Sequence, residues 1–524
     1  MTDVDAIVVG AGPNGLAAAN VLADQGWRVH VVEAQPEPGG AVRTAELTAP
    51  GFRNDLFSSF YPLAVVSPVL ASMELERHGL VWSHAPAVVG HVRPDRPALV
   101  LHRDVDATAA ALDADCAGTG ARYRRLIEEW ATVEHSFMHA LLRPFPPVRP
   151  GLGLLRRAGV HGALDLARRS LLPLRRFAQE ALPGSDAGLL LAGSAMHADL
   201  GPDMPASGLF GWLLTGIGQM HGFPVPRGGA DELTRALVRR MRAQGATLQL
   251  DAPVSEIVIR RGRAAGVRLA DGTEIGARRA VVADCEASHL YGRMMAPDAL
   301  PDGFLERVAR IERAHATFKI DWALAGPIPW SDPSVHGAGT IHLADDLDEM
   351  TMSTAQISCG LVPDRPFLVI GQMTTADPSR SPAGTEAAWA YTHVPQVVRG
   401  DAGGEGISGA WCEADVARFA ARVEARIERH APGFLDLIVG RHLRSPKGFE
   451  ADDANLVGGD INGGTAQLHQ QLVFRPVAGA SRATTPVRGL YLASASAHPG
   501  GGVHGACGAN AARAAIARQR LRLG

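Results

Sequence analysis

The chain has 524 residues, 46% of them hydrophobic and 20% charged, which is the composition of a globular protein with ample material for a large core. Its formal net charge of -3 gives no electrostatic reason to expect a nucleic-acid partner. The five cysteines are scattered and never spaced C-x-x-C, so they support neither a disulfide framework nor a zinc site.

The first residues of the chain differ from a secretory signal. Asp3 and Asp5 stand where such a signal carries positive charge, and the apolar run that follows enters a glycine loop at once. No apolar stretch of the sequence approaches the ~20 residues that span a bilayer. We therefore expect a soluble, cytoplasmic protein.

A glycine-rich loop lies within VVGAGPNGLAAANVL, residues 8–22. We predict a buried strand at residues 6–9, a tight turn, and a helix at residues 16–23 closed by Gly26. The spacing G-x-G-x-x-G permits the turn, a close approach of a pyrophosphate to the backbone, and tight packing of helix on strand. Phosphates would lie at the helix N-terminus, where unpaired N–H groups favour anions. The residues expected to bind the dinucleotide here are Gly10, Gly12, Pro13, Asn14 and Gly15.

An acidic residue, Glu33, follows a second predicted strand at residues 28–32. Its separation from Gly15 along the chain is close to the roughly 20 residues expected for the acid that accepts hydrogen bonds from an adenosine ribose. A carboxylate there also disfavours a 2′-phosphate. A tight turn between core elements is the alternative explanation of the glycines. The complete order of strand, turn, helix, strand and acid favours a dinucleotide site.

A second glycine pair and an arginine come directly after Glu33, in AQPEPGGAVRT. A nicotinamide-binding unit has no need of them. The pattern resembles the FAD-binding half of the amine oxidase and phytoene desaturase superfamily, in its phytoene desaturase-like branch. In that superfamily the glycine pair and the arginine approach the pyrophosphate and the flavin end, which implies this role for Gly39, Gly40 and Arg43. An exposed loop arginine is the alternative for Arg43.

Two later blocks resemble the rest of the same FAD domain. The first, residues 223–284, predicts a helix at 231–244, three strands at 247–250, 254–260 and 264–269, and a returning strand through Val281 and Val282. The resemblance implies that the backbone of Val254 contacts the adenine. The second, residues 489–519, is a strand, a glycine run and an alanine-rich helix. The resemblance implies that backbone N–H groups there face the flavin O2 and stabilise negative charge on reduced flavin, at Gly501, Gly502 and Val503.

These blocks predict an α/β fold with a Rossmann-like FAD-binding domain built from discontinuous segments, residues 1–75, 220–290 and 485–524. Residues 76–219 and 291–484 should form a mixed α+β substrate-binding domain. Its predicted elements are strands at residues 318–326, 366–374 and 386–395 and a helix at 414–430 with Val416, Phe419, Val423 and Ile427 on one face.

The stretch from Arg143 to Arg176 is basic and rich in leucine, with Asp165 its one acid. It suits either a peripheral membrane contact or a lid over an apolar substrate. Short surface helices with solvated arginines are the favoured alternative, because prolines should break the stretch at Pro144, Pro146, Pro147, Pro150 and Pro173.

Motifs that the sequence lacks exclude some classes of redox enzyme. We recognise no second unit of strand, G-x-G-x-x-G turn and helix in the later insertion, residues 291–484, and no redox cysteine pair, so a built-in NAD(P)H site like that of the flavin disulfide reductases is not expected. The economical interpretation is an FAD-dependent oxidoreductase, dehydrogenase- or desaturase-like, that oxidises a C–C or C–N bond of a mostly apolar small molecule and passes electrons to oxygen or a quinone. A non-catalytic lipid or prenyl carrier on the same scaffold and a flavin-dependent, redox-neutral isomerase are the alternatives. The retained glycines and Glu33 argue against the carrier.

Hydride abstraction by a flavin requires no protein base, so no catalytic triad is expected. His498 and His504 flank the glycine run and are the candidates for taking a proton, with Arg475 and His221 as weaker ones. Either histidine could equally be a structural donor. Three acids, Asp452, Asp453 and Asp460, match no calcium loop, so we expect solvated loop acids and no metal.

Overall fold

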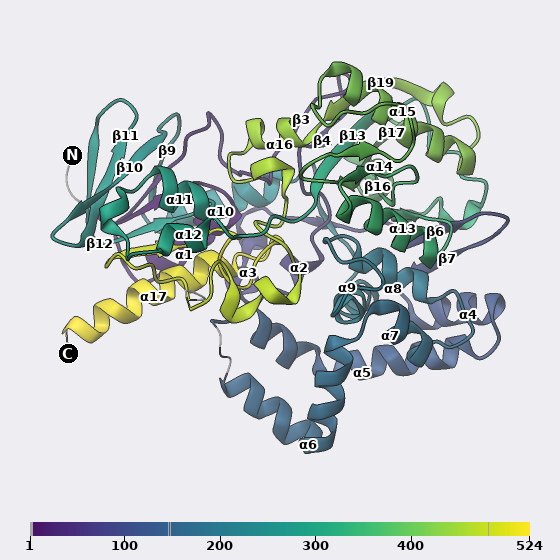
Figure 1. Cartoon of the computed structure of the whole chain (residues 1–524), viewed down its shortest axis with the longest axis horizontal. Helices are drawn as coiled ribbons and strands as arrows, with labels where there is room; N and C mark the ends of the chain where they lie inside the picture. The colour runs from purple at the N-terminus through teal and green to yellow at the C-terminus, as the bar shows by residue number, and fades with distance from the viewer. Residues whose placement is uncertain (1–3, 145, 147, 480–481, 524) are drawn as a thin grey trace.

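The computed structural model describes residues 4–144, 146, 148–479 and 482–523. Within these residues, two seven-stranded sheets form the framework. Figure 1 shows them toward opposite ends of the long axis, with a layer of helices below the second sheet and both chain termini near the first. The predicted α/β class with a Rossmann-like unit is confirmed.

The first sheet has the strand order β10-β11-β12-β1-β2-β9, and β20 pairs with the carboxyl-terminal half of β12. Its strands are β1 (Val4–Val9), β2 (Val29–Val32), β9 (Thr247–Gln249), β10 (Val254–Arg260), β11 (Arg263–Leu269), β12 (Glu274–Ala283) and β20 (Leu490–Leu492). β1 is central because both of its faces are apolar: Ala6 and Val8 enter one core cluster, and Ile7 and Val9 enter another. Burial on both faces is typical of a parallel strand.

Three helices among the described residues pack on one face of this sheet, the face that presents Ala6 and Val8. α10 buries Leu233 and Met241, as its periodicity predicts. α1 begins before the predicted residue 16, because Pro13 suits the first helical position. α17 packs closely on α1, and a Cβ atom on Gly508 would stand 1.8 Å from the carbonyl oxygen of Asn14. The three helices are α1 (Pro13–Ala23), α10 (Asp231–Ala243) and α17 (Ala506–Leu523).

The second sheet has the order β19-β13-β17-β16-β14-β6-β7. Its outer face is apolar and is covered by α15 (Glu413–His430), whose Phe419 meets Phe318 with ring centroids 5.0 Å apart. Its inner face has a different character, because alternate residues carry polar or aromatic groups such as Lys319, Tyr391 and His393. The strands are β6 (Ala87–Arg93), β7 (Arg96–His102), β13 (Ala316–Leu324), β14 (Ala338–Leu343), β16 (Leu368–Gln372), β17 (Glu386–Val394) and β19 (Ile438–Arg444).

The predicted strands and helix of the second unit are confirmed with shifted ends. The strand predicted at 366–374 stops at Gln372, because the short helix α14 (Met373–Ala376) begins there. Strands of the first sheet come from residues 4–32, 247–283 and 490–492, and strands of the second come from residues 87–102 and 316–444. Each sheet is therefore discontinuous in sequence, while the exact domain boundaries stay predictions.

A helical layer connects β7 to the segment before α10. Its members are α4 (Val105–Asp115), α5 (Thr119–Leu141), α6 (Val148–Leu171), α7 (Leu174–Ala181), α8 (Gly188–Ala195) and α9 (Ser207–His221). Among the residues that the structure describes, no helix combines the length and the apolar character needed to cross a bilayer. The shorter elements used below are α2 (Pro62–Val65), α13 (Leu347–Ser358) and α16 (Pro446–Asp452).

The prediction that prolines break the basic stretch into short helices is wrong at Pro150. This residue lies in the first turn of α6, where a proline is tolerated, and the helix is interrupted only at Gly159, with φ 66°. Pro147 lies outside the described residues. Two of its arginines form ion pairs at the surface, Arg168 with Glu180 and Arg169 with Glu129, and Arg168 is exposed as expected.

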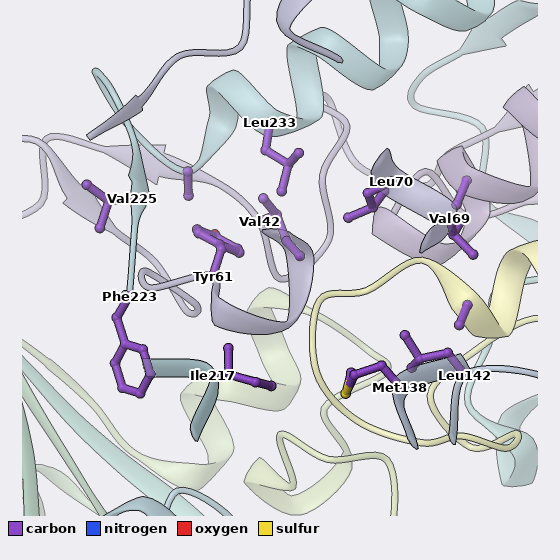
Figure 2. Close-up of a cluster of buried hydrophobic side chains, with 14 of the residues drawn as sticks. Val42, Tyr61, Val69, Leu70, Met138, Leu142, Ile217, Phe223, Val225 and Leu233 are labelled. Carbon is purple, nitrogen blue, oxygen red and sulfur yellow. The ribbon is translucent and has the colours of Figure 1, made fainter. Parts of the chain in front are cut away.

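A buried apolar cluster joins the helical layer to the first sheet's half of the molecule. Figure 2 shows Met138 and Leu142 beside the C-terminal loop, and Ile217 and Phe223 below Tyr61. A hydrogen bond supports this junction, since the side-chain amide of Asn510 donates to the carbonyl of Leu142 over 3.2 Å. The end of α5 is thereby held against α17.

Candidate functional site

The first glycine loop lies between β1 and α1 and is built without side chains. Gly10 has φ +94°, and a Cβ atom on Gly15 would stand 2.1 Å from the Gly10 carbonyl oxygen. Gly12 is the N-cap of α1 and offers no side-chain cap. The positive φ of Gly10 and the close packing of Gly15 therefore require glycine at both positions.

Asp284, at the end of β12, lies under this loop, and the sequence analysis missed it. One carboxyl oxygen, Oδ2, accepts a hydrogen bond from the Gly15 N–H at 2.8 Å. Burial raises the pKa of Asp284 to about 8, and the nearby carboxylates of Asp453 and Glu33 act in the same direction. The sequence does carry a signal for Asp284, because this acid follows the end of a predicted strand, as Glu33 does. Its partner Gly15, however, is 269 residues away along the chain.

Glu33 lies at the carboxyl end of β2, as predicted, and its carboxylate contacts the glycine loop. Its Oε2 accepts from the Ala11 N–H at 2.6 Å and its Oε1 from the Gln35 N–H at 2.9 Å. The chain leading to Val254 lies beside it, because the Ala252 N–H donates to the Glu33 carbonyl over 2.8 Å. The structure therefore brings Val254 near Glu33, while their ribose and adenine roles stay predictions.

The second glycine pair packs directly on the first loop. The Gly39 N–H donates to the carbonyl of Ala11 over 2.9 Å. Gly39 and Gly40 have φ values of +130° and +52°. Arg43 is buried rather than exposed, and its guanidinium donates to the carbonyls of Gly40 at 2.9 Å and Asp452 at 2.8 Å. Arg43 therefore braces this turn from within the protein.

The glycine run before α17 meets three other segments. A Cβ atom on Gly500 would stand 3.0 Å from the Arg475 Cζ, one on Gly501 2.8 Å from the Asn462 Cα, and one on Gly502 2.6 Å from the Leu63 Cδ1. Gly501 and Val503 are half-buried and Gly502 is exposed. α17 itself begins at Ala506, later than the expected approach of the helix to Gly501.

Both candidate histidines have structural partners. The Nε2 of His498 lies 3.0 Å from the carbonyl oxygen of Arg143. The Nδ1 of His504 accepts from the N–H of Ala506, the first residue of α17, at 3.0 Å, and burial lowers the pKa of His504 to about 4. Because the accepting lone pair of His504 is already used, proton uptake there would break the helix cap. The geometry favours the structural alternative for His504.

The two weaker candidates, Arg475 and His221, lie in different parts of the fold. Arg475 is fully buried beside the glycine run, and its guanidinium donates to carbonyls of the loop that precedes it: those of Asn462, Gly463, Gly464 and Thr465, and that of Ala495. His221 instead contacts Glu134 of α5 at 2.9 Å and belongs to the helical layer.

The expectation of solvated acids is wrong for Asp460. It is fully buried and accepts from the backbone N–H groups of Ala314, Asn462 and Gly464 at 2.6 to 3.1 Å. Asp453 is half-buried beside Gly40, and burial raises its pKa to about 6. Among the described residues, no three histidine, cysteine or acidic side chains are placed to hold a metal ion.

These loops fit a dinucleotide by their geometry. Glycines leave bare backbone in these loops, because a Cβ atom on them would press on neighbouring atoms or would need a positive φ. Two buried polar atoms of these loops are without a hydrogen-bond partner among the described residues: Asn14 Oδ1, in the first turn of α1, and Asn462 Nδ2, beside Gly501. A bound cofactor would offer partners to both.

Two protein families match this chain. Residues 8–70 match the NAD(P)-binding Rossmann-like domain, and residues 130–377 match the flavin-containing amine oxidoreductases. Pyridine nucleotide-disulfide oxidoreductase domain-containing protein 2 of Rattus norvegicus is 28% identical, over 97% of this chain and 93% of its own length. Hydroxyneurosporene desaturase of Cereibacter sphaeroides is 27% identical, over 98% and 97%. These matches are consistent with the amine oxidase and phytoene desaturase superfamily.

On these matches the chain is an FAD-dependent oxidoreductase, and FAD is its cofactor. The fold agrees with that of a solved oxidoreductase from Methanosarcina mazei, with a TM-score of 0.61 at 16% identity over 98% of this chain and 99% of the other. The predicted resemblance and cofactor are confirmed, whereas the residues that touch FAD stay predictions.

Proposed function

We propose that this flavoprotein is a dehydrogenase or desaturase that oxidises a C–C or C–N bond of a mostly apolar small molecule and passes the electrons to oxygen or a quinone. The observation that carries the proposal is the convergence of the glycine segments. Gly40 contacts Gly12, and α17, which follows the third segment, packs on the first turn of α1 at Asn14. The first two glycine segments thus share one surface, and the helix that follows the third packs beside it.

We assign the residues of these segments as follows. Gly10, Gly12, Pro13, Asn14 and Gly15 hold the pyrophosphate at the start of α1, Glu33 binds the ribose, and the backbone of Val254 meets the adenine. Gly39, Gly40 and Arg43 close over the pyrophosphate. Gly501, Gly502 and Val503 direct N–H groups at the flavin ring. Bound FAD supplies the two-electron acceptor, and the protein positions the substrate and excludes water.

The substrate class follows from relatives and from the second sheet. A relative that matches nearly the full length is named a desaturase of hydroxyneurosporene, which favours oxidation of a C–C bond. The inner face of the second sheet presents Trp389 and Tyr391, whose rings stack with centroids 5.9 Å apart, and large aromatic surfaces suit an apolar ligand.

Anaerobic titration of the purified holoprotein tests the proposal. The flavin absorption band is followed while apolar alkenes and primary amines are added separately, and the reduced protein is then mixed with oxygen or a soluble quinone. Bleaching by one class, followed by recovery of the band with one acceptor, supports the proposal and identifies both partners. Conversion of a substrate without net acceptor consumption would replace it with the isomerase, and a protein unable to take up FAD would refute it.

A further inference from the structure

Two cations of the second sheet bind the chain that follows the second glycine pair. Lys319 of β13 and Arg444 of β19 are neighbours in this sheet, because they are paired in register. The Lys319 ammonium donates to the carbonyl of Asp55 at 2.9 Å, and the Arg444 guanidinium donates to the carbonyl of Leu56 at 2.6 Å. Adjacent strands of one sheet therefore hold two consecutive carbonyls of a segment that belongs to the predicted FAD-binding domain.

This segment is bonded directly to Arg43. The strand β3 (Thr44–Ala45) begins after Arg43 and pairs antiparallel with β4 (Asn54–Asp55), and Figure 1 shows β4 next to β13. The Leu56 N–H donates to the Arg43 carbonyl over 2.9 Å. Leu56 thus bonds to Arg43 through its N–H and to Arg444 through its carbonyl. One residue connects the second sheet to the turn that Arg43 braces.

The ring of Phe57 contacts both guanidinium groups. The Cζ atoms of Arg43 and Arg444 stand 5.4 Å and 5.1 Å from the ring centroid. Both arginines are buried, with exposures of 8% and 4%, and a cation on an aromatic ring is held most strongly when it is removed from water. Phe57 therefore fixes the side chain of Arg43 relative to that of Arg444.

Asp452, the last residue of α16, accepts hydrogen bonds from both arginines. Its carbonyl accepts from Arg43 at 2.8 Å, and its carboxylate accepts from the Arg444 Nε at 2.8 Å. The next residue, Asp453, packs on the glycine pair, because a Cβ atom on Gly40 would stand 3.3 Å from its carboxyl oxygen. Arg444 therefore fixes a turn on which both Arg43 and Gly40 rest.

We propose that Arg444 is a positioning residue for FAD, which holds Arg43 and Gly40 from the second sheet in the arrangement that binds the cofactor. It acts through the three contacts described above. The inference rests on the proposed function, because the contacts of Arg43 and Gly40 with FAD are assigned there. It extends that function by making FAD affinity depend on the unit that is expected to bind the substrate.

Release of FAD from the holoprotein tests this role. The holoprotein is diluted stepwise, and the fluorescence of free FAD gives the dissociation constant. Arg444→Met should raise this constant by about tenfold or more, because the variant loses the bonds to Leu56 and Asp452 and the ring contact. Arg444→Lys should restore part of the affinity, since lysine keeps the charge but lacks the fork that reaches both partners. Phe57→Leu, a milder change, should raise the constant by about threefold.

Arg441→Met is the matched control on the same strand. Arg441 forms an ion pair with Glu424 of α15 at 2.7 Å, on the outer face of the sheet. Each methionine variant removes one guanidinium and one ion pair from β19, so both should lower the melting temperature measured at saturating FAD. Only Arg444→Met should release FAD. Equal losses of FAD affinity in the two variants, or wild-type affinity in Arg444→Met, would overturn the proposal. Arg444→Lys and Phe57→Leu decide the outcome if Arg444→Met does not fold.

A double-variant cycle separates this inference from the assignment of Arg43. Arg43→Met should itself weaken FAD binding, and Arg444→Met should weaken it much less in that background than in the wild type, because the positioned side chain is gone. Independent effects that multiply in the double variant would overturn the proposal. Weak FAD binding in Arg43→Met with wild-type affinity in Arg444→Met would refute the inference alone. Wild-type affinity in Arg43→Met would refute the assigned role of Arg43 and with it this role of Arg444.

Discussion

Gly40 lies directly against Gly12, and a Cβ atom on Gly40 would stand 3.2 Å from the Gly12 Cα. The two glycine motifs are 28 residues apart in sequence and form one backbone surface in the fold. Gly40 leaves little room for a side chain because Gly12 and Asp453 stand against it, and Gly12 in turn faces Asp284.

Gly40→Ala should weaken FAD binding by about tenfold or more. The new methyl group would displace the first loop and would hold an L-residue at φ +52°, which costs about 1–2 kcal/mol. Gly26→Ala is the matched control, because Gly26 also has a positive φ but has nothing within 4 Å of its Cβ position. FAD titration followed by fluorescence quenching measures both. Equal losses in the two variants would contradict the shared surface.

Asp284→Asn should change the pH dependence of stability. The folded state raises the pKa of Asp284 to about 8, so the unfolded chain ionises this acid first and wild-type stability falls as pH rises from about 4 to about 8. The penalty is at most about 1.4 kcal/mol per pH unit. Asparagine keeps the acceptor for the Gly15 N–H and removes the titration. The gain in melting temperature of the variant over wild type should therefore grow from pH 5 to pH 8 and then level off.

The control for this experiment is Asp298→Asn at an exposed acid. It should show no such growth. FAD affinity gives an independent readout, since an ionised Asp284 under the loop repels the pyrophosphate. Above pH 8 the wild type should lose FAD affinity and the asparagine variant should keep it. If wild type and Asp284→Asn differed by the same amount at every pH, in melting temperature and in FAD affinity, the pKa of Asp284 would not be raised.

Lys319 and Asp321 form a buried ion pair on the inner face of the second sheet, with exposures of 2% and 0%. Lys319 also donates to the carbonyl of Asp55 at 2.9 Å. Lys319→Met should lower stability by about 3–5 kcal/mol, because it leaves a buried carboxylate unpaired. The double variant with Asp321→Asn should recover part of the loss. Lys447→Met, at an exposed lysine, should have little effect on thermal melting.

Arg475→Met should release FAD as well as destabilise the fold. The guanidinium bonds to carbonyls of Asn462, Gly463 and Thr465, and each unpaired buried carbonyl costs about 1–3 kcal/mol. The loop they belong to packs on Gly501. Flavin content after gel filtration, compared with melting temperature, checks the outcome. Arg488→Met, at an exposed site, is the control, and full flavin retention in the Arg475 variant would refute the role of the loop.

His504→Asn should retain flavin reduction by substrate. Asparagine can accept the N–H of Ala506 in place of the imidazole and cannot act as a base. His504→Ala should lose about 1 kcal/mol of stability with the cap. Rapid-reaction measurements of flavin reduction separate these effects. Loss of reduction in a well-folded asparagine variant would restore His504 as the proton acceptor.

The sequence alone identified the elements whose determinants are local. The strand, glycine loop, helix and acid from β1 to Glu33, the face of α10 and the buried positions of α15 follow from periodicity, glycine spacing and helix ends, which involve residues a few positions apart. The family resemblance extended this to the FAD-domain segments and to the cofactor.

Only the tertiary structure decided which distant groups meet. Asp284 accepts a hydrogen bond from Gly15, which is 269 residues away along the chain. The buried Asp460 likewise accepts from the backbone N–H of the distant Ala314. His393 looks like any strand histidine until the packing of α13 and the chain after α8 encloses it. Burial and hydrogen-bond completion are properties of the whole fold, and no local sequence period encodes them.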